Sequence, residues 1–290
     1  MLYSPRYTLL GLCSNPGLKS SATFSQLIQK DFKMKIEGKA AIVTGAGTGV
    51  GRATALQLAG EGCSVIVNYS RSQDAAEEVA EEARQKGVEA IAFKANVAED
   101  LECRALVAEA ERVFSRLDIL INNAGTTRGI PHDQLEEVKL EDWDQILGVN
   151  LRGPFQCTRA ARSLLEANGG GEVIMTSSIA GLRGVGSSIP YAASKAGLNN
   201  LTVTLARVLG PNVRVNAVAP GFIDGSWLKQ VLGDGYEAIK QHQSARAALG
   251  RVSTPEDVAE AILSLIQGSD LVTGHVLPVE GGMLIGSGAG

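Results

Sequence analysis

The chain has 290 residues, of which 44% are hydrophobic and 20% are charged, and its formal net charge is −4. This composition is that of an ordinary soluble globular protein with enough apolar residues to bury a core. Acidic and basic residues are mixed along the chain and aromatic residues make up only 4% of it, so no nucleic-acid partner is expected. No apolar run reaches the roughly 20 residues of a membrane-spanning helix, so no membrane partner is expected either.

Cysteine and histidine residues are spaced too widely for a disulfide framework or a metal site. The four cysteines include no CxxC pair, and none of the three histidines has a second ligand at the usual spacing. This usage fits reduced thiols in the cytoplasm. We therefore expect a cytoplasmic protein that binds no metal.

Residues 1–35 differ in composition from the rest of the chain. They contain several lysines, an arginine and many Ser and Thr residues, with Asp31 as the one acidic residue. This composition has some character of a transit peptide, which would place the protein in an organelle. The alternative, which we favour, is a disordered extension or an untranslated segment upstream of Met34. Residues 36–290 are then expected to form the functional domain.

From residue 39 onward, short apolar runs alternate with longer segments whose apolar residues recur every three or four positions. The short runs predict seven strands, at 40–45, 64–69, 90–97, 117–125, 172–178, 213–221 and 272–279. The longer segments predict helices, several of which end at glycine. Continuous apolar strands separated by helices are typical of a parallel sheet that is covered on both faces. We expect one α/β domain with a doubly wound, seven-stranded parallel sheet.

A glycine-rich turn follows the first predicted strand. The sequence TGAGTGVG at 44–51 does not match GxGxxG, because Val50 occupies the position of the last glycine. It fits GxxxGxG through Gly45, Gly49 and Gly51. Such a turn lets the backbone approach a pyrophosphate at a helix N-terminus, although any tight strand-to-helix turn can also use glycines.

The end of the second strand indicates which dinucleotide would bind. Folds that select NAD usually place an acidic residue about 20 positions after the glycines, where it binds the ribose 2′-hydroxyl. Here the sequence reads VNYSRS with no carboxylate before Asp74, and Ser70 and Arg71 could receive a 2′-phosphate instead. NADP(H) is therefore favoured over NAD(H). The alternative is that Arg71 is a solvated loop residue.

A tyrosine and a lysine lie one helical turn apart in IPYAASKAG at 189–197. Pro190 fits a helix start, so Tyr191 and Lys195 are expected to share one helix face. An ammonium group within about 4–6 Å would lower the pKa of the phenol and make it a usable general acid. The same spacing is common on amphipathic surfaces and is not diagnostic alone.

Together these motifs resemble the short-chain dehydrogenase/reductase family. TGxxxGxG, NNAG at 122–125, Ser178 thirteen residues before Tyr191, YxxxK, and the pair Pro220 and Gly221 occur in the family's order. The similarity covers 39–282. It implies a Rossmann fold, an NAD(P)-dependent enzyme that interconverts ketones and alcohols, and a homotetramer.

The resemblance also implies roles for individual residues. Tyr191 would donate a proton to the substrate carbonyl oxygen as hydride arrives from the nicotinamide, and Ser178 would hold that oxygen. Lys195 would bind the nicotinamide ribose, and Asn150 would hold a water that links the lysine to solvent. Ser177 is a rival to Ser178, but alternation along a strand would point the two side chains in opposite directions.

The predicted cofactor site combines the glycine turn, the strand ends and the positions that match the family. It comprises Gly45, Thr48, Gly49, Val50, Gly51, Ser70, Arg71, Asn96, Val97, Asn123, Ala124, Gly125, Tyr191, Lys195, Pro220, Gly221 and Ile223. Three positions depart from the family's pattern. Asn96 and Gly225 stand where an aspartate and a threonine are common, and Thr48 stands where many NADP-using members have arginine.

The segment at 221–250 is expected to line the substrate site. Its apolar side chains predict either a partly apolar wall or a pair of core helices, and they are Trp227, Leu228, Val231, Leu232 and Tyr236. The loop at 126–137 predicts the opposite wall, where Arg128 could meet a substrate phosphate or carboxylate or could be only solvated.

In overall sequence the chain is most similar to bacterial 3-oxoacyl-(acyl-carrier-protein) reductases, which implies a 3-oxoacyl thioester substrate. The loop at 126–137, however, holds acidic residues where an acidic carrier protein would need basic ones. Reduction of small ketones, sugars or polyols is therefore the alternative. A non-catalytic dinucleotide-binding protein is a third possibility, disfavoured because Asn150, Ser178, Tyr191 and Lys195 all occur.

Overall fold

The computed structural model describes residues 34–286. The extension predicted for 1–35 therefore lies, as far as residue 33, outside the described part of the chain. The side chains of Trp227 and Val231, two of those predicted to line the substrate site, also lie outside it.

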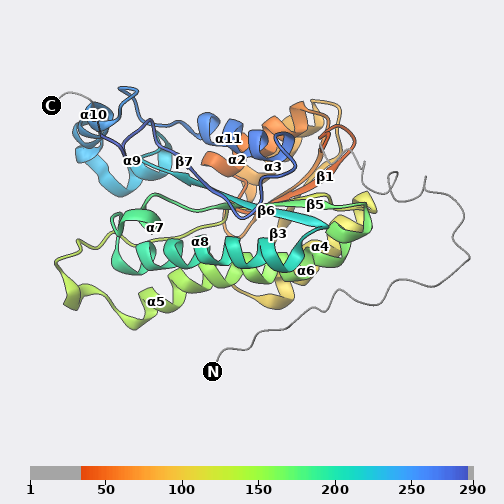
Figure 1. Ribbon diagram of the computed structural model, residues 1–290, viewed down its shortest axis with the longest axis horizontal. Helices are drawn as coiled ribbons and strands as arrows, with labels where there is room; N and C mark the ends of the chain where they lie inside the picture. Colours follow the sequence, from red (N-terminus) through yellow and green to blue (C-terminus); the bar gives the residue numbers. More distant parts are fainter. Residues whose placement is uncertain (1–33, 287–290) are drawn as a thin grey trace, which may run out of the picture. The chain divides into compact units, whose positions relative to one another are not determined.

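Seven parallel strands form one sheet in the order β3-β2-β1-β4-β5-β6-β7 (Figure 1). The strands are β1 (Ala40–Val43), β2 (Ser64–Tyr69), β3 (Ala90–Lys94), β4 (Ile119–Asn122), β5 (Gly171–Thr176), β6 (Val213–Pro220) and β7 (Val276–Val279). Every neighbouring pair is parallel. The predicted α/β fold with a doubly wound sheet is confirmed, and the order of strands reverses between β1 and β4, where such folds bind ligands.

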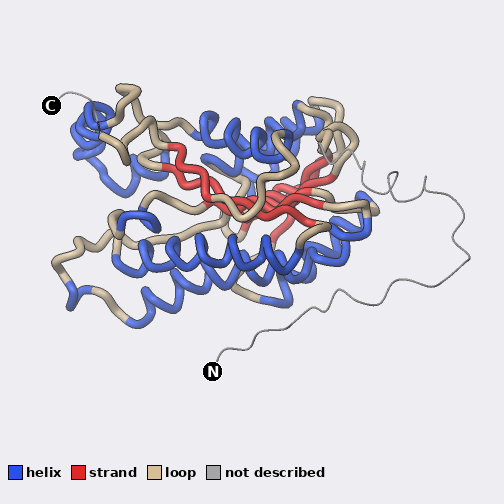
Figure 2. The backbone as a smooth tube through the Cα atoms, viewed as in Figure 1, coloured by secondary structure: helices blue, strands red, loops and turns tan. Residues whose placement is uncertain are grey.

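Helices cover both faces of the sheet (Figures 1 and 2). One face packs on α2 (Gly49–Gly60), α3 (Gln73–Arg84) and α11 (Pro255–Gln267), and the other on α4 (Asp100–Phe114), α6 (Gly153–Ala167) and α8 (Ile189–Leu209). Side chains alternate between the two cores: Val43 and Val65 lie in the first, and Ile42 and Ile66 in the second. Burial on both faces explains why the strands are continuous apolar runs.

The remaining short elements connect the strands at the sheet's carboxyl edge. They are α5 (Leu140–Leu147), α7 (Ala180–Arg183), α9 (Ser226–Leu232), α10 (Tyr236–Arg246), a π-helical turn at Gly148–Arg152, and 3-10 turns at Leu135–Glu137 and Gly233–Gly235. Several strands are shorter than predicted, because residues at their carboxyl ends leave the sheet. Gly45, for example, has φ +61° and begins the turn after β1. These departing residues form the walls of the site.

Candidate active site

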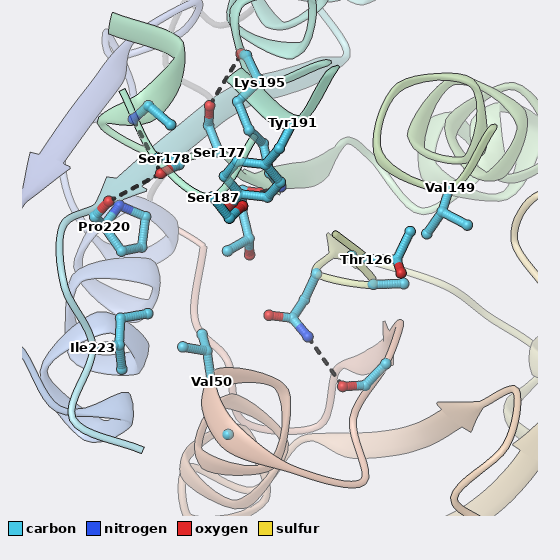
Figure 3. A pocket seen from close by; sticks show the side chains of 18 of the residues that line it. Val50, Thr126, Val149, Ser177, Ser178, Ser187, Tyr191, Lys195, Pro220 and Ile223 are labelled. Carbon is cyan, nitrogen blue, oxygen red and sulfur yellow. Dashed lines mark hydrogen bonds between the residues drawn. The ribbon is translucent and has the colours of Figure 1, made fainter. Parts of the chain in front are cut away.

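The carboxyl edge of the sheet opens into a cavity of about 1220 Å³ (Figure 3). Most of the predicted site residues line it: Gly45, Thr48, Gly49, Val50, Ser70, Arg71, Asn96, Val97, Asn123, Ala124, Gly125, Ser178, Tyr191, Lys195, Pro220, Gly221 and Ile223. Gly51 and Asn150 do not line it. Residues that are far apart in the chain thus meet at the switch point between β1 and β4.

The three glycines of the turn after β1 have different structural reasons. A Cβ on Gly45 would lie 2.9 Å from Ala124 Cα, and one on Gly51 would lie 2.4 Å from the Gly45 carbonyl oxygen. Gly49 has φ +54°, but a Cβ there would meet no atom within 4 Å. Close packing therefore explains why positions 45 and 51 are glycine. Position 49 faces open space, and there the positive φ favours glycine.

Buried polar side chains hold this turn in place. The Asn68 Oδ1 accepts a hydrogen bond from Gly45 N at 3.2 Å, and the Asn123 Nδ2 donates to the carbonyl oxygens of Thr44 and Gly45 at 2.9 and 3.1 Å. The Thr44 hydroxyl accepts from the backbone N–H groups of Asn123 and Ala124. Sequence reasoning missed Asn68, and the one polar residue inside the run VIVNY is the signal that could have found it.

The start of α2 fits the pyrophosphate of a dinucleotide. Thr48 precedes the helix, but its side chain makes no capping hydrogen bond, and the first turn contains no acidic residue. The first N–H groups of a helix have no intrahelical acceptor, so here they remain as donors beside the cavity. With Gly49 facing open space, this donor set suits a phosphate group.

The end of the cavity next to β2 carries a guanidinium group that has no partner among the described residues. Ser70 and Arg71 follow β2, are exposed and line the cavity, and Arg71 has no hydrogen bond or ion pair with any residue in 34–286. Ser72, which sequence reasoning missed, also lines this end. None of the lining residues from Asn68 to Ser72 is acidic. The side chain of Asn96 is partly engaged, since its Oδ1 accepts from Ala98 N.

The start of α8 positions the tyrosine and the lysine. Ser188 caps the helix by accepting a hydrogen bond from Tyr191 N at 3.4 Å, and Pro190 lies in the first turn as predicted. Tyr191 and Lys195 then face the cavity from one side of the helix, close to Ser178 (Figure 3). The Lys195 Nζ lies 5.6 Å from the centroid of the Tyr191 ring.

The electrostatics of this pair differ from the sequence-based expectation. Burial lowers the pKa of Lys195 to about 8, and its Nζ donates to the Thr176 carbonyl oxygen at 2.7 Å. Burial raises the pKa of Tyr191, and the Ser178 hydroxyl lowers it only in part. The expected net lowering of the Tyr191 pKa is therefore wrong for the protein alone, because burial of the phenol dominates.

The two serines after β5 are used differently. The Ser177 Oγ lies 2.5 Å from Asn199 Oδ1 and 3.3 Å from the Lys195 carbonyl oxygen, so this hydroxyl is bonded to α8. The Ser178 Oγ accepts from Ala180 N at 3.1 Å and lies 3.5 Å from the Pro220 carbonyl oxygen. Ser178 is only half-buried and retains the more accessible hydroxyl, in agreement with the alternation expected along a strand.

Asn150 lies behind the cavity wall, in the π-helical turn, and is completely buried. Its Nδ2 donates to the Thr126 carbonyl oxygen and to the Ser194 hydroxyl, while its Oδ1 accepts from Thr126 N at 2.8 Å. A Cβ on Gly125 would lie 3.7 Å from Asn150 Oδ1 and 3.9 Å from Lys195 Nζ. Asn150 therefore fixes the loop after β4 next to Lys195.

The substrate side of the cavity was the least accurately predicted. Leu228 lines it, but Tyr236 is 3% exposed, with its ring 5.8 Å from that of Phe222 and its hydroxyl bonded to Asp224. Arg128 is paired with Asp142 at 2.8 Å, which competes with any substrate anion. Sequence reasoning missed the lining residues Arg183, Ser187 and Met283. Thr126, Gln243 and Arg246 also line the cavity and lie in the two segments predicted as its walls, although they were not singled out.

Neither a metal cluster nor a membrane helix is found between residues 34 and 286. No group of three or more His, Cys, Asp and Glu side chains in this range could hold a metal ion. No helix in it is long and apolar enough to cross a membrane. The cysteines it contains, Cys63, Cys103 and Cys157, are buried and free.

Comparison with known proteins agrees with this geometry. A family model described as enoyl-(acyl carrier protein) reductase matches residues 45–284. The chain is 44% identical to a ketoacyl reductase of the granaticin polyketide synthase of Streptomyces violaceoruber, over 85% of this chain and 96% of the relative. It is 39% identical to a 3-oxoacyl-[acyl-carrier-protein] reductase of Staphylococcus aureus, over 84% of this chain and 98% of that protein.

A solved structure shows the same fold. It is described as a short-chain dehydrogenase/reductase from Burkholderia xenovorans, and it matches with a TM-score of 0.79 and 38% sequence identity. The match covers 86% of this chain and 98% of that one. The chain therefore belongs to the short-chain dehydrogenase/reductase family of NAD(P)-dependent oxidoreductases.

Proposed function

We propose that the protein is an NADP(H)-dependent reductase that converts the ketone of a 3-oxoacyl thioester to a secondary alcohol. The observation that carries the proposal is the meeting of Ser178, Tyr191 and Lys195 on the cavity that the glycine turn also lines. Relatives described as ketoacyl and 3-oxoacyl reductases support the choice of substrate class.

The chemistry follows from the environment of each side chain. Bound nicotinamide supplies a hydride to the carbonyl carbon. Because burial raises the pKa of Tyr191, its phenol stays protonated near neutral pH and can donate a proton to the carbonyl oxygen. The Ser178 hydroxyl would donate a hydrogen bond to the same oxygen and stabilise the charge that develops there.

Lys195 would then offset the negative charge left on Tyr191. With a pKa of about 8, the ammonium form predominates at pH 7. A charge in a buried position acts strongly on its neighbours because little water screens it. Asn150 and Gly125 keep the loop after β4 close to Nζ, so that the lysine is held in place.

The choice of NADP(H) rests on the end of the cavity next to β2. Arg71 is a planar cation without a partner among the described residues, and Ser70 beside it is a neutral donor. Both suit a 2′-phosphate, and none of the lining residues from Asn68 to Ser72 has a carboxylate that could bind a 2′-hydroxyl.

A second candidate is the reduction of small ketones, sugars or polyols. It is favoured by the loop after β4, where Asp133, Glu136 and Glu137 are exposed. These acidic residues would repel an acidic carrier protein. They would not affect a small neutral ketone.

A matrix of initial rates tests both candidates. NADPH and NADH are each combined with a 3-oxoacyl thioester of N-acetylcysteamine, a diketone, an aldose and a simple ketone. The proposal expects the highest kcat/KM with NADPH and the thioester. Equal rates for the thioester and a simple ketone would contradict the first candidate, and a preference for NADH would contradict the assignment of Arg71.

We also propose, from family membership, that the enzyme is a cytoplasmic homotetramer. The chain mass is 30.3 kDa. Light scattering coupled to size-exclusion chromatography should give about four times this mass, and a monomeric mass would contradict the proposal. Fluorescence microscopy of the full-length chain with a C-terminal tag should show diffuse cytoplasmic signal, and organellar signal would instead assign residues 1–35 as a transit peptide.

A further inference from the structure

A second cavity, of about 350 Å³, adjoins the active-site cavity. It is lined by Arg183, Arg246, Met283, Leu284, Ile285 and Gly286. The first three of these residues also line the active-site cavity. The two spaces therefore share a wall that contains two arginines.

Both arginines are free of protein partners. Arg183 is the last residue of α7 and Arg246 the last of α10; both are exposed, and neither has an ion pair or a hydrogen bond with a residue in 34–286. Other exposed arginines differ: Arg104 is paired with Asp100, whereas Arg71 and Arg207 have no partner in the described part of the chain. None of the described residues that line the second cavity is acidic. The nearby Glu280 directs its carboxylate at Leu284 N, at 2.9 Å.

Two unpaired guanidinium groups on one cavity form a suitable site for an anion. Arginine binds carboxylate and phosphate groups through two parallel hydrogen bonds, and like charges that share a space repel each other until an anion lies between them. A favourable interaction with the carboxyl end of a helix explains each arginine separately. It does not explain why two different helices direct them to the same cavity.

The position of the arginines relative to Ser178 shows which part of a substrate they would meet. Arg183 lies one turn of helix beyond Ser178 in the chain, and both arginines are exposed whereas Lys195 is only 4% exposed. The reacting ketone would lie deep in the cavity, so an anion at the arginines must belong to a remote part of the same molecule. Acyl thioesters carry such a group, since coenzyme A and the phosphopantetheine arm of carrier proteins both contain phosphate.

We propose that Arg183 and Arg246 bind the phosphate of the thioester's carrier arm and so select phosphate-bearing acyl thioesters. The inference rests on the proposed function. It adds a binding site to it, because the hydride transfer itself does not need these two residues. The phosphate could belong to coenzyme A or to a carrier protein, and the test separates these sources.

The test compares matched thioesters on Arg183→Gln, Arg246→Gln and the double variant. One 3-oxoacyl chain is presented as its coenzyme A thioester, as its N-acetylcysteamine thioester, which has no phosphate, and on a carrier protein. Each single variant should raise the KM for the coenzyme A thioester about five- to twenty-fold, since a charge-assisted hydrogen bond is lost. Neither kcat nor KM for the N-acetylcysteamine thioester should change, and the KM for NADPH should stay constant.

Arg207→Gln is the matched control. Arg207 is an exposed arginine in the last turn of α8, without a partner in the described part of the chain, and it lines neither cavity. Arg207→Gln should leave kcat and the KM values for all three thioesters and for NADPH unchanged. Arg183→Lys should recover part of the lost affinity, because it restores the charge but not the planar group.

Three results would overturn the inference. An equal rise in KM for the thioesters with and without phosphate would show that the arginines have a structural role. A rise confined to the carrier-protein substrate would show that they contact the surface of the carrier protein. An increased KM for NADPH would show that they bind the cofactor. If wild-type enzyme reduces none of the three thioesters, the proposed function itself fails. The two failures are thus distinguishable.

Discussion

Two segments that line the same cavity are held in place by different means. The turn after β1, at 44–51, is fixed by close backbone contacts, by the buried side chain of Asn68 and by the half-buried side chain of Asn123. The segment after β6 is fixed by the buried ring of Tyr236 and by half-exposed side chains, with Lys240 2.5 Å from Asp224. Lys240, followed by Tyr236, holds the pKa of Asp224 below its ordinary value.

The difference indicates how the two segments divide the work. Close packing cannot accept an added atom, so the first segment can offer one rigid surface for one ligand. Contacts between exposed side chains contribute little to stability and can be replaced. The second segment is therefore free to determine which substrate is accepted, while the first and the ends of β4 and β5 maintain the chemistry.

A large effect on turnover is expected between these segments, at Ser178. Ser178→Ala removes the hydroxyl proposed to hold the carbonyl oxygen, and kcat should fall about 100- to 1000-fold, as for the loss of one donor to a developing oxyanion. Ser177→Ala is the control, because its hydroxyl is bonded to α8, and it should lose less than about tenfold. Steady-state kinetics with NADPH would measure both, and a larger loss for Ser177→Ala would reverse the assignment.

Two glycines of α2 test the rigidity of the first segment. In Gly51→Ala the new Cβ would lie 2.4 Å from the Gly45 carbonyl oxygen, so the free energy of unfolding should fall by about 1–3 kcal/mol and NADPH should bind more weakly. Gly60→Ala, in the same helix, meets nothing within 4 Å and should stabilise the protein by up to about 1 kcal/mol. Urea unfolding and NADPH titration would show both effects, and similar behaviour of the two variants would refute the packing argument.

Arg71 tests the cofactor preference of the same segment. Arg71→Ala should raise the KM for NADPH roughly tenfold, through loss of a charge-assisted hydrogen bond, and leave the KM for NADH unchanged. The preference for NADPH over NADH would then become smaller without any change in kcat. Equal changes with both dinucleotides would mean that Arg71 does not contact the 2′-phosphate.

Lys195 gives a smaller effect on stability, which depends on pH. Its pKa in the folded protein, about 8, lies below its ordinary value of 10.5, so unfolding takes up protons between these limits. The buried ammonium therefore destabilises the folded protein most below pH 8, and this destabilisation disappears as the pH rises toward 10.5. Lys195→Met should therefore be more stable than wild type by about 1–2 kcal/mol at pH 7, less so at pH 9.5, and inactive at both. A constant difference across this pH range would contradict the pKa assignment.

The contrast between the two segments also explains what the sequence could predict. The sheet, the turn after β1 and the start of α8 could be predicted because their signals are local in the sequence. These signals are the apolar runs, the glycine spacing and Pro190. The burial of Tyr236 could not be predicted in this way, since a tyrosine in an amphipathic segment suits a core and a cavity wall equally. Arg183 and Arg246 line one cavity only because the fold brings the ends of α7 and α10 to it.

The pKa of Tyr191 was mispredicted for a related reason. Sequence spacing places Lys195 on the correct face of the helix, but it does not show which acceptor the ammonium chooses. That acceptor, the Thr176 carbonyl oxygen, belongs to β5. Burial, which raises the pKa, depends on the whole fold.

The central claim is that Tyr191 donates the proton, and the most direct test is the turnover of Tyr191→Phe with NADPH and a 3-oxoacyl thioester. The account predicts that kcat falls about 100- to 10 000-fold, as for loss of a general acid, while circular dichroism and the dissociation constant for NADPH stay close to wild type. Turnover within about twofold of wild type would show that another group supplies the proton, and would contradict the mechanism proposed for this cavity.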